Sequence, residues 1–119
     1  MIVPFDYRYW FNKLFLDCTT LTKAPELPSP VVSEFCYNSM FDGCTSLKIA
    51  PELPATTLGA SCYAYMFRRC TSLTTAPELP ATQLAGNCYQ YMFKDCTSLI
   101  KAPSVLPATS SSSGYQYMF

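Results

Sequence analysis

Seven cysteines are the residues of this chain best suited to chemistry, and they fall into two series. The first series is Cys18, Cys44, Cys70 and Cys96, and the second is Cys36, Cys62 and Cys88. Thiolates bind metals, attack electrophiles and form disulfides, and each role needs a particular environment or spacing. Within each series the cysteines are 26 residues apart, so their spacing follows a long period and not a local motif.

This spacing does not suit a metal site or a catalytic thiol. Zinc sites typically have about two to four residues between paired cysteines, whereas Cys36 and Cys44 are eight positions apart. The chain has no histidine, which excludes histidine as a general base or a metal ligand. It also lacks the nucleophile-elbow, P-loop and dinucleotide-binding motifs. We therefore predict a protein that is not an enzyme and that has no catalytic residue, metal or cofactor.

The cysteines also do not read as the disulfide framework of a small secreted protein. Their number is odd, and they occur at repeated positions, where a free cysteine behaves as a small buried apolar residue. We expect reduced thiols stacked in columns. Equivalent residues of neighbouring coils lie about 5 Å apart, however, which is within disulfide reach, so bridges between coils stay an alternative.

Composition limits the classes of partner. Half of the residues are apolar and 13% are charged, which is typical of a folded domain and not of a disordered segment. Eight basic residues balance eight acidic ones, and neither sign is clustered. We predict no nucleic-acid binding and no membrane insertion, because there is no basic patch and no apolar run long enough to span a bilayer. The N-terminus has no signal-peptide pattern.

The whole sequence follows the same 26-residue period as the cysteines. Residues 44–69 and 70–95 share C-T-S-L, A-P-E-L-P-A-T and Y-M-F at matching positions. Such a period predicts one domain of stacked coils. Its parts are a degenerate N-terminal coil or cap (1–17), three repeats (18–43, 44–69, 70–95) and an incomplete last repeat (96–119). Because the last repeat stops on an apolar motif, we expect a fragment of a longer array, or end-to-end association there.

Each coil is predicted to contain a short strand and a short helix. Prolines such as Pro51 lack an N–H, so we expect a strand of a few residues at 47–50 that ends before the proline. In residues 56–70, Leu58, Cys62 and Met66 are spaced i, i+4 and i+8, which indicates a helix with Thr56 or Thr57 as its N-cap.

The predicted fold class is therefore an α/β repeat solenoid, a leucine-rich-repeat-like right-handed superhelix. Short parallel strands would form one face and short helices the other. Four columns of repeated residues should form its interior. They are Leu21/Leu47/Leu73/Leu99, Leu27/Leu53/Leu79/Val105, Met40/Met66/Met92 and Phe15/Phe41/Phe67/Phe93.

Positions that vary between repeats are the candidate binding surface, because residues that hold a stack together repeat and outward ones need not. On the strands the candidates are Lys23, Lys48, Ile49, Thr74, Thr75, Ile100 and Lys101, and on the helices they are Tyr65 and Tyr91. A column of Glu26, Glu52 and Glu78 can bind a cation or a basic partner, or can simply be solvated.

The repeated pattern C-Y-x-x-M-F-x-x-C-T-S-L, followed by A-P-E-L-P-A-T, resembles the BspA-like class of leucine-rich repeats. It is carried by Met40-Phe41 with Cys44 and Leu47, by Met66-Phe67 with Cys70 and Leu73, and by Met92-Phe93 with Cys96 and Leu99. The resemblance implies an adhesion or protein-binding module of a bacterial cell-surface protein. It also implies an extracellular location, with a host surface or matrix protein as partner. The strand motif departs from the family because Ala-Pro occupies it.

Two rival functions remain at this stage. One is a structural spacer within a longer surface or phage fibre protein, which would leave the strand face monotonous. The other is a redox- or metal-linked cysteine protein, which a count of free thiols would test.

Overall fold

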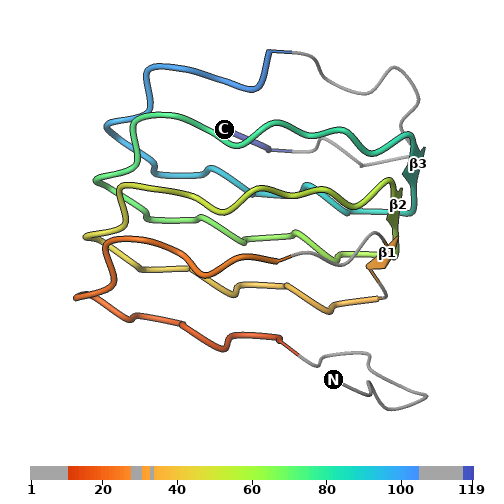
Figure 1. The fold of residues 1–119 in the computed structure, drawn as a ribbon, viewed down its shortest axis with the longest axis horizontal. Helices are drawn as coiled ribbons and strands as arrows, with labels where there is room; N and C mark the ends of the chain where they lie inside the picture. The colour runs from red at the N-terminus through yellow and green to blue at the C-terminus, as the bar shows by residue number, and fades with distance from the viewer. Residues whose placement is uncertain (1–10, 28–30, 33, 105–116) are drawn as a thin grey trace.

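The computed structural model describes residues 11–27, 31–32, 34–104 and 117–119. The chain winds into a stack of flattened turns, here called coils, that lie one above another (Figure 1). Residues in register on successive coils are 26 positions apart, as in the pair Thr57 and Gln83. The coils therefore follow the period of the sequence.

Three short parallel strands line one narrow edge of the stack. They are β1 (Val31–Val32), β2 (Thr57–Leu58) and β3 (Gln83–Leu84), paired in the order β1-β2-β3 (Figure 1). Val31 lies beside Thr57, and Thr57 lies beside Gln83. These strands fall where the sequence indicated the start of a helix.

The strand expected at residues 47–50 is reduced to isolated bridges, which join Lys23 to Ile49 and Thr75 to Lys101. A proline follows two residues after each bridge position, as Pro51 follows Ile49. Because proline has no N–H, the ladder cannot continue past the bridge. The prediction that proline would shorten pairing here is confirmed, but the longest ladder lies elsewhere in the coil.

The predicted helix of residues 56–70 was wrong, and the described residues contain no helix. The N–H groups of Tyr63, Tyr65 and Phe67 donate to carbonyl groups of the next coil, 2.9 to 3.0 Å away. The N–H groups between them close turns within the coil, as Met66 N–H donates to the Tyr63 carbonyl at 3.1 Å. Alternate N–H groups thus join coils and close turns.

Backbone geometry explains why a helix cannot form. Ser61, Tyr65 and Arg69 have φ angles of 55°, 59° and 62°, and a helix needs a negative φ at every residue. Tyr65 is the third residue of the turn closed by Tyr63 and Met66, where a type II turn has positive φ. The turn pattern repeats every four residues, so its buried positions imitate the spacing of a helix.

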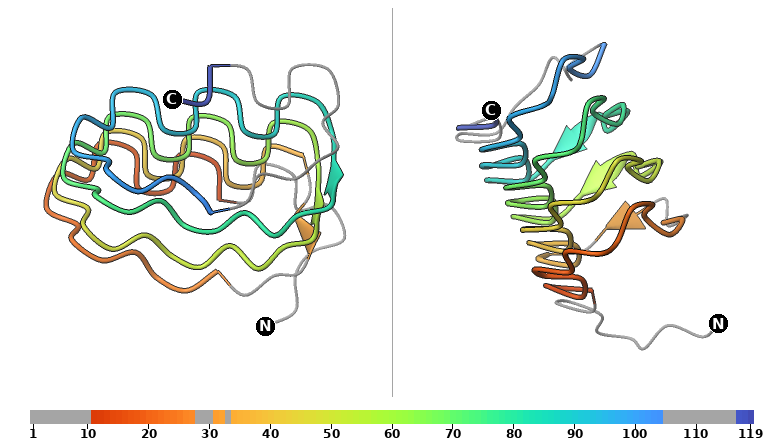
Figure 2. Two further views of the ribbon diagram at one scale, coloured as in Figure 1. Left: turned by 90° about the horizontal axis from the view of Figure 1, so that it is seen from above. Right: turned by 90° about the vertical axis from the view of Figure 1, so that its left-hand side faces the viewer.

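The coil has two long sides, which we name by their content. The turn face consists of residues 11–18, 35–44, 61–70 and 87–96, and its backbone undulates with each turn (Figure 2). The proline face consists of residues 19–27, 45–55, 71–81 and 97–104 and carries the A-P-E-L-P segments. The coils lie close together along the turn face and fan out along the proline face (Figure 2).

The core between the two faces is built from the repeated apolar columns that the sequence indicated. The columns of Met40, Phe41, Leu47 and Leu53 are buried in the central coils, with Leu21 and Leu99 partly buried at the ends. Val105 lies outside the described residues. Within the described ranges, no helix is long and apolar enough to cross a membrane.

Aromatic rings form continuous columns through the stack. Phe15, Phe41, Phe67, Phe93 and Phe119 stack with successive centroid distances of 5.6, 5.6, 5.7 and 5.6 Å. Each such pair contributes roughly 0.5–1.5 kcal/mol beyond the burial of its area. The columns hold the coils in register, because a slip would break every pair at once.

Candidate binding surface

The structure brings most of the predicted surface residues together. Seven of them lie on the proline face and are exposed: Lys23, Lys48, Ile49, Thr74, Thr75, Ile100 and Lys101. The other two, Tyr65 and Tyr91, lie on the turn face and are partly buried. The predicted set is therefore two separate surfaces on opposite sides of the coil.

The proline face exposes large aliphatic side chains. Ile49 is 55% exposed and Ile100 is 87% exposed, next to Lys48 and Lys101 respectively. Ile49 lies on the backbone bridge to Lys23, so its position is fixed by the stack. This face therefore has two solvent-exposed isoleucines that a partner can contact, at positions fixed by backbone pairing between coils.

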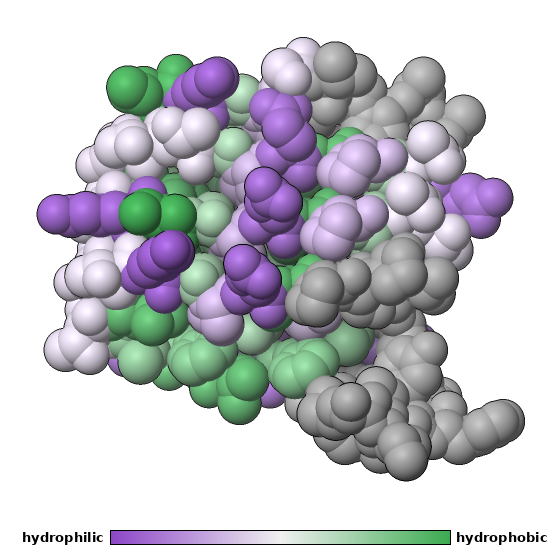
Figure 3. All heavy atoms as spheres, in the orientation of Figure 1, coloured by the Kyte–Doolittle hydropathy of each residue, from purple (hydrophilic) through white to green (hydrophobic). Residues whose placement is uncertain are grey.

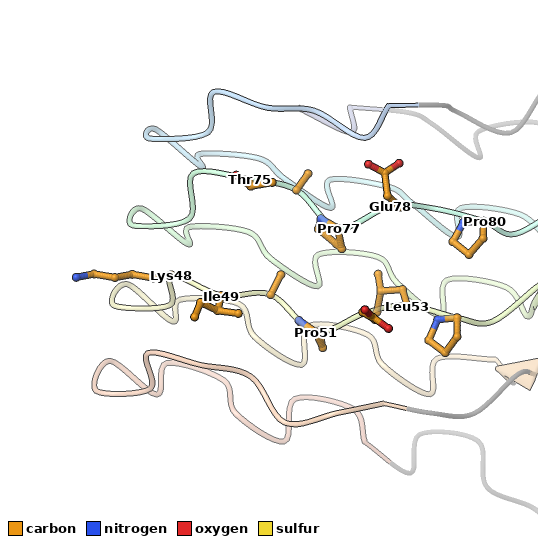
Figure 4. Close-up of a pocket in the computed structure, with 12 residues that line it drawn as sticks. Lys48, Ile49, Pro51, Leu53, Thr75, Pro77, Glu78 and Pro80 are labelled. Atoms are coloured by element: carbon orange, nitrogen blue, oxygen red, sulfur yellow. The ribbon is translucent and has the colours of Figure 1, made fainter.

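Grooves separate successive coils on this face because the coils fan out there. One groove, of about 570 Å³, lies between the coil of Ile49 and the coil of Thr75 (Figure 4). Its walls are mostly apolar and include Pro51, Leu53 and Pro77. An equivalent groove of about 500 Å³ lies one coil earlier. The grooves repeat with the sequence, so the face offers the same apolar furrow at successive levels.

Sequence reasoning missed the prolines as lining residues. Pro51, Pro54, Pro77 and Pro80 all line the larger groove, but prolines recur at these positions between coils and were expected only to end a strand. Their signal was the lack of an N–H, which prevents close pairing of coils. A position that cannot pair leaves space between coils, and this space is the groove.

Charged residues on the proline face gather by sign. Lys23, Lys48 and Lys101 lie at the edge where the bridges form, and all three are exposed. The exposed carboxylates Glu26, Glu52 and Glu78 follow three or four residues further along each coil. The space-filling view of this face shows hydrophilic side chains in a column along its middle and at its left-hand edge (Figure 3).

Glu78 has a hydrogen-bond partner on the next coil. Its carboxylate accepts hydrogen bonds from the hydroxyl of Ser104 at 2.7 Å and from the backbone N–H of Ser104 at 3.0 Å. These bonds favour the ionised form and lower the pKa of Glu78. The serine that interrupts the glutamate column thus holds its neighbour as a carboxylate.

The tyrosines of the turn face form a ladder. Tyr65, Tyr91 and Tyr117 stack with centroid distances of 5.0 Å, and Arg68 lies 4.8 Å from the Tyr65 ring centroid. Lys94 lies 5.2 Å from the centroid of Tyr91. Because the ring faces stack on one another along the column, this ladder is poorly suited to stack on a flat ligand.

A buried ion-pair network on the turn face was not foreseen. Asp42 is 1% exposed, and its two oxygens accept hydrogen bonds from Nε of Arg68 at 3.0 Å and Nε of Arg69 at 2.9 Å. The sequence signal was present, because Asp42 occupies the same repeat position as Arg68 and Lys94. Opposite charges at one repeat position meet on neighbouring coils.

The cysteines are free thiols in the structure, and five of the seven are buried. Thiols of the first series approach backbone carbonyls of the preceding coil, as Sγ of Cys70 lies 3.2 Å from the Phe41 oxygen. Burial raises the pKa of Cys44, Cys88 and Cys96 to about 11. Burial and neighbouring thiols raise the pKa of Cys62 and Cys70 further.

These environments disfavour thiol chemistry. The thiolate is the form that binds metal and attacks electrophiles, and a raised pKa suppresses it at neutral pH. In the part of the chain that the structure describes, no group of three or more cysteine, aspartate or glutamate residues is arranged to hold a metal ion.

Comparison of the chain with protein-family models, with curated proteins and with solved structures found no match. The resemblance to BspA-like repeats therefore stays a prediction from the motif.

Proposed function

We propose that this chain is a non-catalytic protein-binding module and that its binding surface is the proline face. The observation that carries the proposal is the exposure of Ile49, which lines both apolar grooves, together with the exposure of Ile100 on the same face. A partner that removes these side chains from water is bound more tightly, because burial of apolar area stabilises a complex by about 25 cal/mol per Å².

The arrangement of the face suits a protein better than a small molecule. The grooves are open and repeat along the stack, and exposed lysines and glutamates surround their apolar walls. An apolar centre with a polar rim is the usual organisation of a protein interface. The motif resemblance supports the same class of function, adhesion by a bacterial cell-surface protein in an extracellular setting.

The state of the thiols supports a role without catalysis. Cys62 and Cys70 are fully buried and their pKa values are raised, so neither is available as a nucleophile at neutral pH. The absence of histidine from the chain removes the most common general base.

A structural spacer in a longer surface or phage fibre protein is the second candidate. The continuous phenylalanine column and the hydrogen bonds between coils favour it, because both stiffen the stack along its length. A spacer has no need, however, for exposed isoleucines on one face.

A binding screen against cell-surface and matrix proteins tests the proposal with two matched variants. The test variant combines Ile49→Ser, Ile100→Ser and Lys48→Ser. The control combines Leu14→Ser, Leu16→Ser and Lys94→Ser on the turn face, where Leu14 is 54% and Leu16 39% exposed. The two variants thus remove the same kinds of side chain from opposite faces.

We expect partners captured by the wild-type protein to be lost from the test variant and retained by the control. Equal loss from both variants would overturn the proposal, and a folded wild-type protein that binds neither a protein of the screen nor a second copy of itself would favour the spacer.

A further inference from the structure

The proline face carries two parallel columns of opposite charge. The bridges place Lys23 level with Ile49, and Thr75 level with Lys101, so the lysines share one edge, with Lys48 one residue away. The glutamate column starts three residues after Lys23, at Glu26. An extended chain rises about 3.3 Å per residue, which puts the columns on the order of 10 Å apart.

Ion pairing differs between the proline face and the turn face. Among the described residues, none of Lys23, Lys48, Lys101, Glu26, Glu52 and Glu78 forms an ion pair. The turn face differs, because Asp42 there pairs with Arg68 and Arg69. Glu26, Glu52 and Glu78 occupy matching positions of neighbouring coils and repel one another, whereas Lys23 and Lys101 are level with Ile49 and Thr75. An opposing surface that brings lysines over the glutamate column would relieve this repulsion.

A second copy of the same face is such a surface. A two-fold axis that runs along the stack, midway between the columns, places the lysine column of each copy opposite the glutamate column of the other. A two-fold axis across the stack would instead place lysines opposite lysines. Because an isologous interface uses the same patch on both copies, the charges select the first axis.

The face also has the size and the apolar content that a dimer needs. The protein measures 34 by 33 by 18 Å, and the proline face is one of its two broad sides, seen in Figures 1 and 3. A stable interface takes about 800 Å² from each partner, which is less than the area of such a side. Ile49 and Ile100 lie on this side and would be covered by the second copy.

From these observations we infer that the partner of the proline face is a second copy of this chain, with the two stacks side by side and parallel. The inference rests on the proposed function and specifies its partner class as homotypic. Burial of the isoleucines supplies the affinity, and the charge columns set the orientation.

Charge-reversal variants of the full chain test this inference by sedimentation-velocity centrifugation over a concentration series. One variant combines Lys23→Glu, Lys48→Glu and Lys101→Glu. The other combines Glu26→Lys, Glu52→Lys and Glu78→Lys. We expect the wild-type protein to sediment as a dimer and each variant alone to lose the dimer, because both columns then carry one sign. An equimolar mixture of the two variants should recover the dimer.

Two further samples guard against misfolding. Glu78→Lys removes the bonds to Ser104, so a version with only Glu26→Lys and Glu52→Lys is run beside it. Ile100→Asp alone changes the most exposed isoleucine and should also abolish the dimer, while Lys94→Glu on the turn face should leave it unchanged.

A wild-type protein that stays monomeric at every concentration overturns the inference, as does a dimer that survives both charge reversals. If the wild-type protein is monomeric but binds another protein in a manner that Ile49→Ser and Ile100→Ser abolish, the inference fails and the proposed function stands. If it binds neither itself nor another protein, both fail.

Discussion

Asp17 and Arg69 are 52 residues apart in the sequence, yet Nη2 of Arg69 lies 3.0 Å from Oδ1 of Asp17. The coil between them contributes Gly43, with a φ of 80°. A Cβ at this position would collide with the Asp17 carboxylate. The glycine thus lets two coils that are not neighbours interact across a third.

Gly43→Ala should destabilise the fold by about 2 kcal/mol, because alanine is strained at positive φ and its methyl group would displace Asp17. Urea unfolding followed by circular dichroism measures the change. The matched control is Gly86→Ala, where a Cβ meets no atom within 4 Å, and this change should be neutral or mildly stabilising. Equal midpoints for the two variants would contradict the role given to Gly43.

The carboxylate of Asp42 should be the most sensitive charge in the chain. Its side chain is 2% exposed and pairs with Arg68 and Arg69, whose side chains are 36% and 43% exposed. Asp42→Asn keeps the shape and removes the charge, at a cost of about 2–3 kcal/mol, because the arginines can still reach water. Chemical denaturation would measure it. Asp95→Asn at an exposed position is the control and should change stability by less than about 0.5 kcal/mol.

Alkylation should report the burial of the thiols. Burial raises the pKa of Cys44, Cys88 and Cys96 to about 11, against about 8.5 for a free cysteine. At pH 8 the thiolate population of these cysteines should therefore be roughly two orders of magnitude lower in the native protein than in the denatured one. The rate of alkylation by iodoacetamide should be lower by the same factor. Mass spectrometry of the native and denatured protein gives the ratio for each cysteine. Fast labelling of Cys88 in the native protein would show that the core opens readily.

The same thiols should make the protein less stable in alkali. A thiol whose pKa is higher in the folded state binds its proton more tightly there. Its contribution to the free energy of unfolding is therefore complete below the unfolded pKa of about 8.5. The contribution is lost as pH rises from there to about 11, the folded pKa of Cys44, Cys88 and Cys96. Thermal midpoints measured from pH 7 to pH 10 should fall, and Cys88→Ala should flatten the curve. A midpoint independent of pH would exclude this linkage.

The sequence predicted the stack and its interior but not the conformation of half of each coil. The 26-residue step and the burial of Met40, Phe41 and Leu47 follow from identical residues at a fixed period, which can be buried together only by stacking. The helix failed because Leu58, Cys62 and Met66 fit a helix and a four-residue turn pattern equally well. The sequence signal for turns was weak, because only Asp17, Gly43, Asn87 and Asp95 among the described positive-φ residues are of types that favour this conformation.

The binding surface was predictable only in part, for a related reason. Variation between repeats located Lys48, Ile49 and Ile100 on the proline face, because residues free of the stack are free to vary. The same criterion placed Tyr65 in the set, although its ring stacks on Tyr91 within the ladder. Sequence variation between repeats identifies positions outside the core. It does not distinguish a residue of a binding face from a residue at a strained turn position.

Strain at the positive-φ positions gives the last prediction. Ser61 is the third residue of the turn closed by Gly59 and Cys62, and its φ is 55°. Ser61→Gly should stabilise the fold by about 0.5–1 kcal/mol, because glycine adopts this conformation without the Cβ clash. Ala60→Gly, one residue earlier and outside the positive-φ set, should destabilise it by about 0.5–1 kcal/mol through the entropy of the unfolded chain. Urea midpoints that move in opposite directions for these adjacent changes would support the turn geometry, since in a helix both glycines would be destabilising.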